Sequence, residues 1–225
     1  MKIGLLIIAT NRYIQFVKPL WDSVKKNFMP GHEISMFVFT NMPETPEGTI
    51  RIQHEHTPWP GPTLLRYHCF TKNKQALEGM DFLYYLDADM LVVGEVGDEV
   101  MGYSIATLHP GFFDKPKNMF SYEKRPQSSC YVAPHQGDNY YAGGFNGGTF
   151  SGYMTMAEVC RDMIDADGRK GIIPVWHDES AMNRYFIDHP PSIILTPSYC
   201  YQEGRTLPFR QKILALNKNH AQMRS

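Results

Sequence analysis

The sequence is poor in the features that mark several classes of protein. Its 225 residues include only four cysteines, none in a CxxC pair, so neither a zinc ribbon nor a disulfide framework is indicated. Basic residues number 22 and acidic residues 23, without the basic excess typical of nucleic-acid-binding proteins. No apolar stretch approaches the roughly 20 residues needed to cross a bilayer. We therefore expect reduced cysteines, no membrane span and no nucleic-acid partner.

The amino-terminal segment is apolar but is not typical of a signal peptide. Its apolar run over residues 3–9 is short, and Asn11 and Arg12 follow without a small-residue cleavage site. A buried first strand over residues 2–9 is the better interpretation. Together with the cysteine usage, this indicates a soluble, cytoplasmic protein.

The length of the whole chain, 225 residues, fits a single domain. In its first half, strand and helix patterns alternate. Strands are expected at residues 2–9, 33–40, 49–55 and from 82 onward. Helices are expected at about 18–28, with Pro19 in the first turn, and near 64–79. Residues 109–150 are rich in glycine, proline, tyrosine and phenylalanine and are expected to form loops. This order predicts an α/β fold with a mixed, mostly parallel sheet flanked by helices.

Asp87 and Asp89 stand one residue apart within the apolar run 82–93. Burying an unpaired carboxylate is costly, so we expect both aspartates where the strand ends. Two carboxylates at such an edge suit joint coordination of one divalent cation. Aspartate is also a good turn former, and the spacing alone leaves both interpretations open.

Residues 140–148 contain four glycines, for which a pair of tight turns is the favoured interpretation. This run is not a phosphate loop, because no lysine followed by serine or threonine comes after it. His54 and His56 alternate on an extended segment with no third ligand nearby, which favours an exposed strand face over a metal site.

Residues 176–180 precede an expected short helix over about 180–188, which Pro190 and Pro191 terminate. Asp178 could cap this helix and Glu179 could interact with its dipole, without any role in catalysis. The basic, polar segment from Lys212 to Arg224 is by composition a flexible terminus.

Eight segments, spread over nearly the whole chain, match one known family in the same order. They are residues 28–32, 37–40, 84–90, 107–112, 121–128, 138–144, 176–180 and 218–220. Through them the chain resembles glycosyltransferase family 6, which includes the ABO blood-group transferases and α1,3-galactosyltransferase. The resemblance implies the GT-A fold, a Rossmann-like α/β sheet. It also implies transfer of galactose or N-acetylgalactosamine from UDP with retention at the anomeric carbon. The chain is expected to be a microbial or viral type of member that lacks the membrane anchor.

The resemblance divides the single domain into three parts. Residues 1–90 would bind the nucleotide, residues 91–210 would bind the donor sugar and acceptor, and residues 211–225 would form a flexible basic tail. Asp87 and Asp89 would hold Mn²⁺ on the diphosphate, a form of Lewis-acid catalysis. The residues assigned to the nucleotide and diphosphate are Ile8, Ala9, Tyr13, Arg66, Asp87, Lys218 and Arg224. By this likeness the tail would be ordered when UDP is bound.

The resemblance places Glu179 beneath the anomeric carbon, as a stabiliser of positive charge or as a nucleophile. The donor-sugar residues would be Arg66, Ala142, Gly143, Gly144 and Asp178. The acceptor residues would be His109, Ser121, Trp176 and Glu203. The small Gly144 is expected to leave room for an acetamido group, which favours UDP-GalNAc over UDP-galactose.

Departures from the family pattern affect the metal and the acceptor. Many bacterial members replace the two aspartates by asparagines and work without metal, whereas this chain keeps both carboxylates. Gln202 replaces the acceptor aspartate of the blood-group enzymes, so Glu203 is expected to take over its contact. The prediction is a Mn²⁺-dependent α1,3-N-acetylgalactosaminyltransferase acting on a galactose-containing acceptor. The alternatives are a UDP-galactose-dependent enzyme and a carbohydrate-binding homologue without transfer activity.

Overall fold

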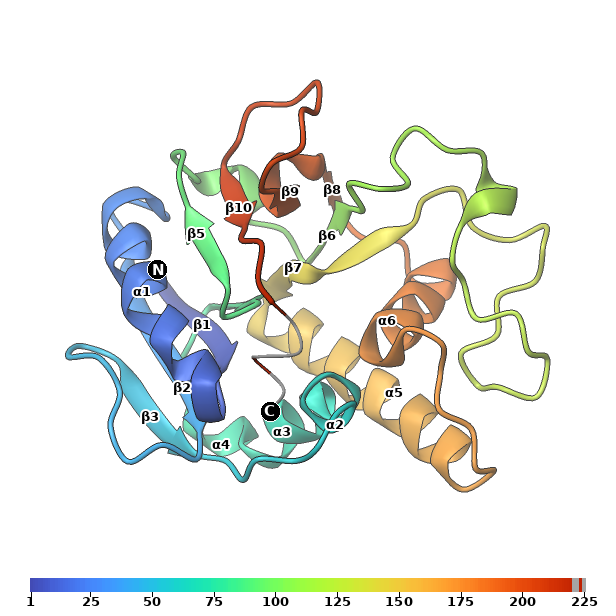
Figure 1. The fold of residues 1–225 in the computed structure, drawn as a ribbon, viewed down its shortest axis with the longest axis horizontal. Coiled ribbons are helices and arrows are strands. Elements are labelled where there is room, and N and C mark those ends of the chain that lie inside the picture. The colour runs from blue at the N-terminus through green and yellow to red at the C-terminus, as the bar shows by residue number, and fades with distance from the viewer. Residues whose placement is uncertain (220–222, 224–225) are drawn as a thin grey trace.

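The computed structural model describes residues 1–219 and 223 and contains a seven-stranded sheet in the order β3-β2-β1-β4-β7-β6-β8 (Figure 1). Four of the six neighbouring pairs are parallel, and β7 is antiparallel to both of its neighbours. The predicted α/β class with a mixed, mostly parallel sheet is therefore confirmed.

The first strands of the sheet lie close to their predicted positions. They are β1 (Lys2–Ile8), β2 (Glu33–Thr40), β3 (Ile50–Gln53) and β4 (Phe82–Leu86). Six of the seven residues of β1 and all five of β4 are buried. Strands buried on both faces read as continuous apolar runs, which is why the sequence located them well.

The second half of the sheet was not predicted from the sequence. It contains β6 (Ser104–Leu108), β7 (Tyr141–Thr149) and β8 (Ile193–Leu195). The interpretation of residues 140–148 as tight turns is wrong, because most of this run forms the buried strand β7. A Cβ atom at Gly147 would lie 2.3 Å from the Tyr84 ring and 2.5 Å from the Leu83 carbonyl oxygen. Glycine there permits the close contact between β7 and β4.

Helices cover both faces of the sheet (Figure 1). Their bounds are α1 (Ile14–Asn27), α2 (Gly61–Leu64), α3 (Arg66–Lys72), α4 (Lys74–Leu77), α5 (Phe150–Gly168) and α6 (His177–Asp188). A smaller sheet joins β5 (Met90–Val92), β10 (Ile213–Ala215) and β9 (Tyr201–Gln202). The short 3₁₀ helices are η1 (Asn11–Tyr13), η2 (Asp98–Val100), η3 (Lys117–Met119) and η4 (Pro197–Cys200).

The helix predictions were only partly correct. Helix α1 begins at Ile14, so Pro19 lies inside the helix rather than in its first turn. The single helix expected near 64–79 is broken into α2, α3 and α4. Helix α5 was not predicted: the composition of residues 109–150 indicated loops, and no helix was assigned to the segment that follows.

Two large apolar clusters pack the interior, one including Leu5 and Phe145 and the other including Leu6 and Phe70. Leu5 and Leu6 are neighbours on β1 and point to opposite faces of the sheet. The carboxyl ends of β1 and β4 meet at one edge, which is where ligands bind in open α/β sheets. None of the helices in residues 1–219 and 223 is long and apolar enough to cross a membrane.

Candidate active site

Asp87 and Asp89 lie in a turn directly after β4, as expected. The amide of Met90 donates to the Asp87 carbonyl oxygen at 3.2 Å, so the turn interpretation is correct for the backbone. The Asp87 side chain has a further role, since its Oδ1 accepts from the Tyr85 hydroxyl at 2.6 Å and from Arg66 Nη2 at 3.3 Å. Tyr85 and Arg66 therefore both hold the Asp87 carboxylate through the same oxygen, Oδ1.

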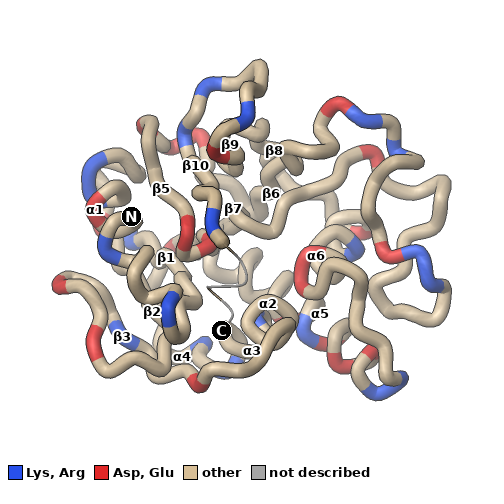
Figure 2. Tube along the Cα trace, viewed as in Figure 1, with Lys and Arg blue, Asp and Glu red and all other residues tan. Residues whose placement is uncertain are grey.

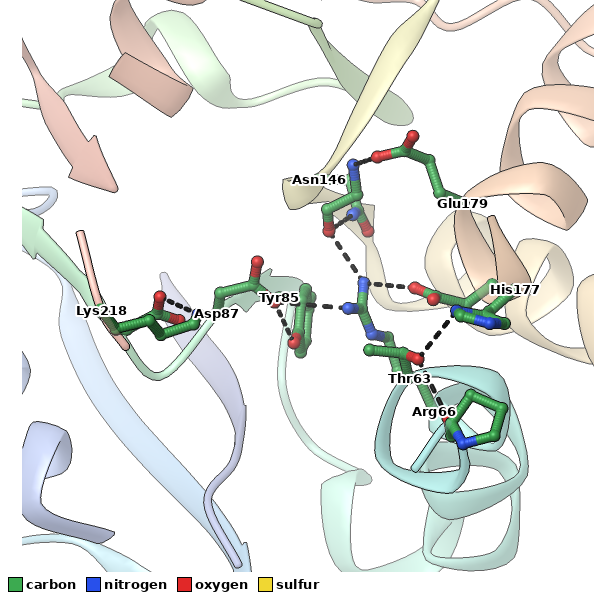
Figure 3. Close-up of polar contacts among 12 residues, drawn as sticks. Thr63, Arg66, Tyr85, Asp87, Asn146, His177, Glu179 and Lys218 are labelled. Carbon is green, nitrogen blue, oxygen red and sulfur yellow. Dashed lines mark hydrogen bonds and ion pairs between the residues drawn. The ribbon is translucent and has the colours of Figure 1, made fainter. Parts of the chain in front are cut away.

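Arg66 lies at the centre of the site and is 3% exposed. Its Nη1 donates to the Gly143 carbonyl oxygen at 2.8 Å and lies 2.8 Å from Asp178 Oδ2. Its guanidinium also lies 3.7 Å from the centre of the Tyr85 ring, a cation–π contact. Figure 3 shows Arg66 between the Asp87 side and the Glu179 side of the site. One arginine thus connects α3, β4, β7 and α6.

Glu179 lies in the first turn of α6, and each of its carboxylate oxygens accepts a hydrogen bond. The Tyr140 hydroxyl donates to Oε1 and the Gly143 amide to Oε2, both at 2.7 Å. Burial raises the pKa of Glu179 to about 7 although both hydrogen bonds favour the ionised form. Burial likewise raises the pKa of Asp178 to about 6 despite the neighbouring Arg66. The pKa values of these two neighbouring carboxyl groups on α6 are therefore both raised.

The start of α6 is fixed by contacts that the sequence did not indicate. Asp178 is not the cap of the helix; Trp176 precedes the first turn, and its amide donates to Ser180 Oγ at 2.9 Å. Asn183 ties α6 to β7, because it accepts from the Tyr141 amide and donates to the Tyr141 carbonyl, both at 2.9 Å. These bonds explain how Glu179 reaches the glycine-rich strand.

A cavity of about 180 Å³ extends from the aspartates toward the end of β1. Ile8, Tyr13, Asp87, Asp89 and Lys218 all line it. Of the other residues predicted to bind the nucleotide, Arg66 lies next to this cavity through Asp87, whereas Ala9 is buried in the sheet. Arg224 lies outside the described residues.

Lys218 reaches back from beyond β10 into this cavity. Its ammonium group forms a hydrogen-bonded ion pair with Asp89 and lies 5.3 Å from the centre of the Tyr13 ring. Figure 2 shows acidic and basic positions side by side where β5 begins and the chain leaves β10. Burial and the nearby Asp87 raise the pKa of Asp89, while Lys218 opposes this shift. Lys218 is the cation that balances Asp89 in the described structure.

The two aspartates fit the way Mg²⁺ and Mn²⁺ are often bound. Such ions commonly take one or two carboxylates from the protein and complete their coordination with phosphate oxygens and water. No group of three histidine, cysteine or acidic side chains suited to a metal occurs in residues 1–219 and 223. The site is therefore compatible with a cation shared with a phosphate ligand, not with a closed protein cage.

The residues predicted to bind the acceptor do not all line one cavity. His109 packs edge-on against Tyr140 with ring centres 5.6 Å apart. Its Nδ1 accepts from the Gly111 amide at 3.0 Å, which leaves the proton of the neutral ring on Nε2. Burial and the nearby Arg205 lower the pKa of His109 to about 4. His109 is thus a neutral hydrogen-bond donor at neutral pH.

Ser121 and Trp176 line a second, more open cavity of about 660 Å³. Trp176 is 50% exposed, so part of its surface is accessible to a ligand. Glu203 belongs to neither cavity, and its Oε2 accepts from the Asn217 amide at 2.7 Å. Its carboxylate holds the segment after β10 in the described structure.

The segment Ala142–Gly144, which was predicted to contact the donor sugar, lies on β7 beside Glu179 and Arg66. A Cβ atom at Gly143 would lie 3.4 Å from Glu179 Oε2. A Cβ atom at Gly144 would lie only 2.4 Å from Met90 Cε and 3.1 Å from Asp87 Oδ2. The Asp87 amide also donates to the Gly144 carbonyl oxygen at 3.0 Å. Gly144 therefore permits close packing of β7 on the aspartate turn.

Sequence reasoning missed the roles of Tyr85, Tyr140 and Asn183. Tyr85 occurs in an apolar run and Tyr140 beside the glycines, where an aromatic residue suggests packing only. Asn183 occurs on a helix with no distinguishing pattern. Tyr140 and Asn183 bond to residues distant in the chain, and Tyr85 contacts the distant Arg66 as well as the nearby Asp87, so no local sequence pattern indicated these roles.

Comparisons with known proteins agree with this geometry. The family model "Glycosyltransferase family 6" matches residues 1–225. The chain is 31% identical to the rat histo-blood group ABO system transferase 1 over 99% of the chain and 68% of that protein. It is 30% identical to the human globoside α-1,3-N-acetylgalactosaminyltransferase 1 over 100% of the chain and 69% of that protein. It is 28% identical to the Escherichia coli O-antigen biosynthesis glycosyltransferase WbnI over 90% of the chain and 89% of that protein.

The mixed sheet and the strand-end carboxylates define a glycosyltransferase with a GT-A-like fold. More narrowly, the chain belongs to glycosyltransferase family 6, and it is a hexosyltransferase. The resemblance inferred from the eight segments is confirmed.

Proposed function

We propose that the protein is a retaining, Mn²⁺-dependent α1,3-N-acetylgalactosaminyltransferase. It would transfer GalNAc from UDP-GalNAc to a galactose-containing acceptor. The observation that carries this proposal is the position of Glu179. It accepts from the Gly143 amide on the strand expected to set donor choice, and three hydrogen bonds in series connect it through Gly143 and Arg66 to Asp87. A carboxylate that can stabilise positive charge is thus connected to the carboxylate that would hold the leaving group.

The metal would be bound by Asp87 and Asp89 together with the diphosphate oxygens, and it would neutralise the charge of the departing UDP. Arg66 is positioned to orient Asp87 and to add positive charge beside the donor sugar. The bond between the anomeric carbon and the diphosphate oxygen would break with its electron pair leaving on UDP, and the acceptor oxygen would form the new glycosidic bond while its proton passes to the departing diphosphate. Retention arises by front-face attack or by double displacement.

The hydrogen bonds to Glu179 favour a charge-stabilising role. Both carboxylate oxygens accept short hydrogen bonds, at 2.7 Å each. Hydrogen bonds to a carboxylate stabilise its negative charge, which lowers its reactivity as a nucleophile. His109, through Nε2–H, and the half-exposed Trp176 are suited to bind the acceptor galactose.

UDP-galactose is the alternative donor, and the packing around Gly144 supports it. The space beside Gly144 in the direction of a Cβ atom is filled by Met90, so this glycine does not itself create a pocket for an acetamido group. The human α-1,3-galactosyltransferase 2 is 27% identical over 89% of the chain and 63% of that protein. The name of the globoside relative, an α-1,3-N-acetylgalactosaminyltransferase, by contrast supports the GalNAc assignment.

The test is a product assay with UDP-GalNAc and UDP-galactose against a panel of galactosides, with Mn²⁺ or with excess EDTA. We expect GalNAc transfer with Mn²⁺ and loss of turnover with EDTA. Asp87→Asn should weaken UDP–Mn²⁺ binding. Product formation only from UDP-galactose would overturn the donor assignment, and full activity in EDTA would overturn the metal assignment. Sugar binding without any product would identify the third possibility, a transfer-inactive homologue.

A further inference from the structure

His56 and Thr10 form a polar pair in the cavity of about 180 Å³ that Asp87 and Asp89 also line, here called the nucleotide cavity. The pair lies at the end of this cavity opposite the aspartates. Thr10 follows β1 and is buried, whereas His56 follows β3 and has an exposed side chain. His56 Nδ1 and Thr10 Oγ1 are 2.9 Å apart, within hydrogen-bond distance. Both residues line the same cavity as Asp87 and Asp89. The roles assigned so far to the site leave this pair unexplained.

The arrangement of the cavity determines which end of a nucleotide meets this pair. Asp87 and Asp89 follow β4, and Thr10 follows the adjacent strand β1, with β2 and β3 beyond it. The cavity wall also includes Ile8, Tyr13 and Pro62, which suit the faces of a base or a ribose. If the diphosphate is held at the aspartates, the base extends toward Thr10 and His56.

We propose that His56, oriented by Thr10, reads the N3–C4 edge of uracil and thereby selects uridine over cytidine nucleotides. The inference rests on the proposed use of a UDP-sugar and assigns the residue that recognises its base. The ligand class is a pyrimidine nucleoside diphosphate with a carbonyl group at C4.

The chemistry of this pair favours uracil in either tautomer of His56. Because Nδ1 is engaged with Thr10, Nε2 is the ring nitrogen left for a ligand. When Nε2 carries the proton, it donates to the C4 carbonyl oxygen, which cytosine replaces by an amino group. When Nε2 is unprotonated, it accepts from the N3–H group, which cytosine replaces by a lone pair. With cytosine, therefore, two hydrogen-bond donors face each other in the first case and two acceptors in the second, and both arrangements are unfavourable.

His54 serves as a control within the same segment. It lies two residues from His56, and its backbone amide donates to the Thr40 carbonyl oxygen at 3.0 Å. Unlike His56, it does not line the nucleotide cavity. His54→Ala therefore removes a neighbouring imidazole without touching the proposed recognition pair.

The experiment measures the dissociation constants of UDP and CDP by isothermal titration calorimetry with the full chain and Mn²⁺. We expect the unaltered protein to bind UDP more tightly than CDP. His56→Ala should weaken UDP about three- to tenfold, the usual value of one hydrogen bond, and leave CDP nearly unchanged. Thr10→Val should likewise reduce the preference for UDP over CDP, that is, the dissociation constant of CDP divided by that of UDP. His54→Ala should leave this preference unchanged. Circular dichroism would verify that each variant is folded.

The outcomes separate this inference from the proposed function. If His56→Ala kept the same preference for UDP over CDP, whether or not both nucleotides bound more weakly, the proposed role of His56 would be overturned. Equal affinity of the unaltered protein for UDP and CDP would do the same. Failure of the unaltered protein to bind UDP at all would instead overturn the proposed donor.

Discussion

The hydroxyl of Tyr140 lies 2.7 Å from Oε1 of Glu179 and donates a hydrogen bond to it. The Tyr140 ring is buried and also contacts His109 on the acceptor side. One aromatic side chain thus orients the proposed charge-stabilising carboxylate and supports an acceptor residue. Glu179 is held by the strand β7 on one oxygen and by this phenol on the other.

Tyr140→Phe should lower kcat about tenfold, because Glu179 loses a hydrogen bond to its charged form. The same loss should raise the pKa of Glu179 above about 7 and move the rising limb of the pH–rate profile to higher pH. The measurement is kcat against pH at saturating donor. Tyr122→Phe is the control, since that hydroxyl donates to the Asn139 carbonyl oxygen instead. An identical pH midpoint in Tyr140→Phe would contradict the coupling.

Glu179 should also make folding stability depend on pH. Its pKa in the folded protein, about 7, is above its ordinary value of 4.5, so the folded state binds the proton more tightly. Stability contributed by this group should therefore fall as pH rises from about 4.5 to about 7, by about 1–3 kcal/mol. Urea unfolding of Glu179→Gln should show a flatter dependence over this range. The exposed Glu78→Gln should keep the original slope, and an unchanged slope in Glu179→Gln would refute the assignment.

Lys218 should compete with a divalent cation for Asp89. Its ammonium group forms an ion pair with the same carboxylate that is proposed to hold the metal. Lys218→Gln should therefore bind Mn²⁺ alone severalfold more tightly, because no tethered cation has to be displaced. Calorimetric titration of Mn²⁺ without nucleotide measures this directly. Lys212→Gln is a matched control, because Lys212 pairs with Glu99 instead. Weaker binding of Mn²⁺ to Lys218→Gln would count against competition.

Gly144→Ala should destabilise the protein by about 1–3 kcal/mol through overpacking. The added methyl group would lie 2.4 Å from Met90 Cε, which must move and disturb the aspartate turn. Thermal unfolding measures the loss, and Gly168→Ala provides the comparison, since a Cβ atom there meets nothing within 4 Å. Equal melting temperatures for Gly144→Ala and the unaltered protein would show that Met90 yields without cost.

The sequence predicted the parts of the fold that have a local cause. Strands β1 and β2 were found because their burial makes continuous apolar runs, and Asp87 and Asp89 stood out as charges in such a run. Strand β7 was misread because glycine-rich runs favour turns locally. Only its pairing with β4 and β6, both distant in sequence, makes it a strand.

The candidate site shows the same limit. Glu179 and Arg66 were assigned through the resemblance, since acidic residues at a helix start and a single arginine in a helix have ordinary structural explanations. The bonds that fix them come from Tyr140, Gly143 and Tyr85, which are brought near by tertiary packing. Such contacts between distant segments leave no periodic trace in one sequence.

The backbone of Gly143 has a consequence for how this site can change over time. Its amide holds Glu179 and its carbonyl holds Arg66, and both groups exist whatever side chain occupies the position. The side chain at Gly143, where a Cβ atom would meet its nearest neighbour at 3.4 Å, can therefore be changed without removing the bonds that align the charged groups. If residues 142–144 set donor choice, as proposed, a change of side chain at Gly143 would leave the backbone bonds to Glu179 and Arg66 in place.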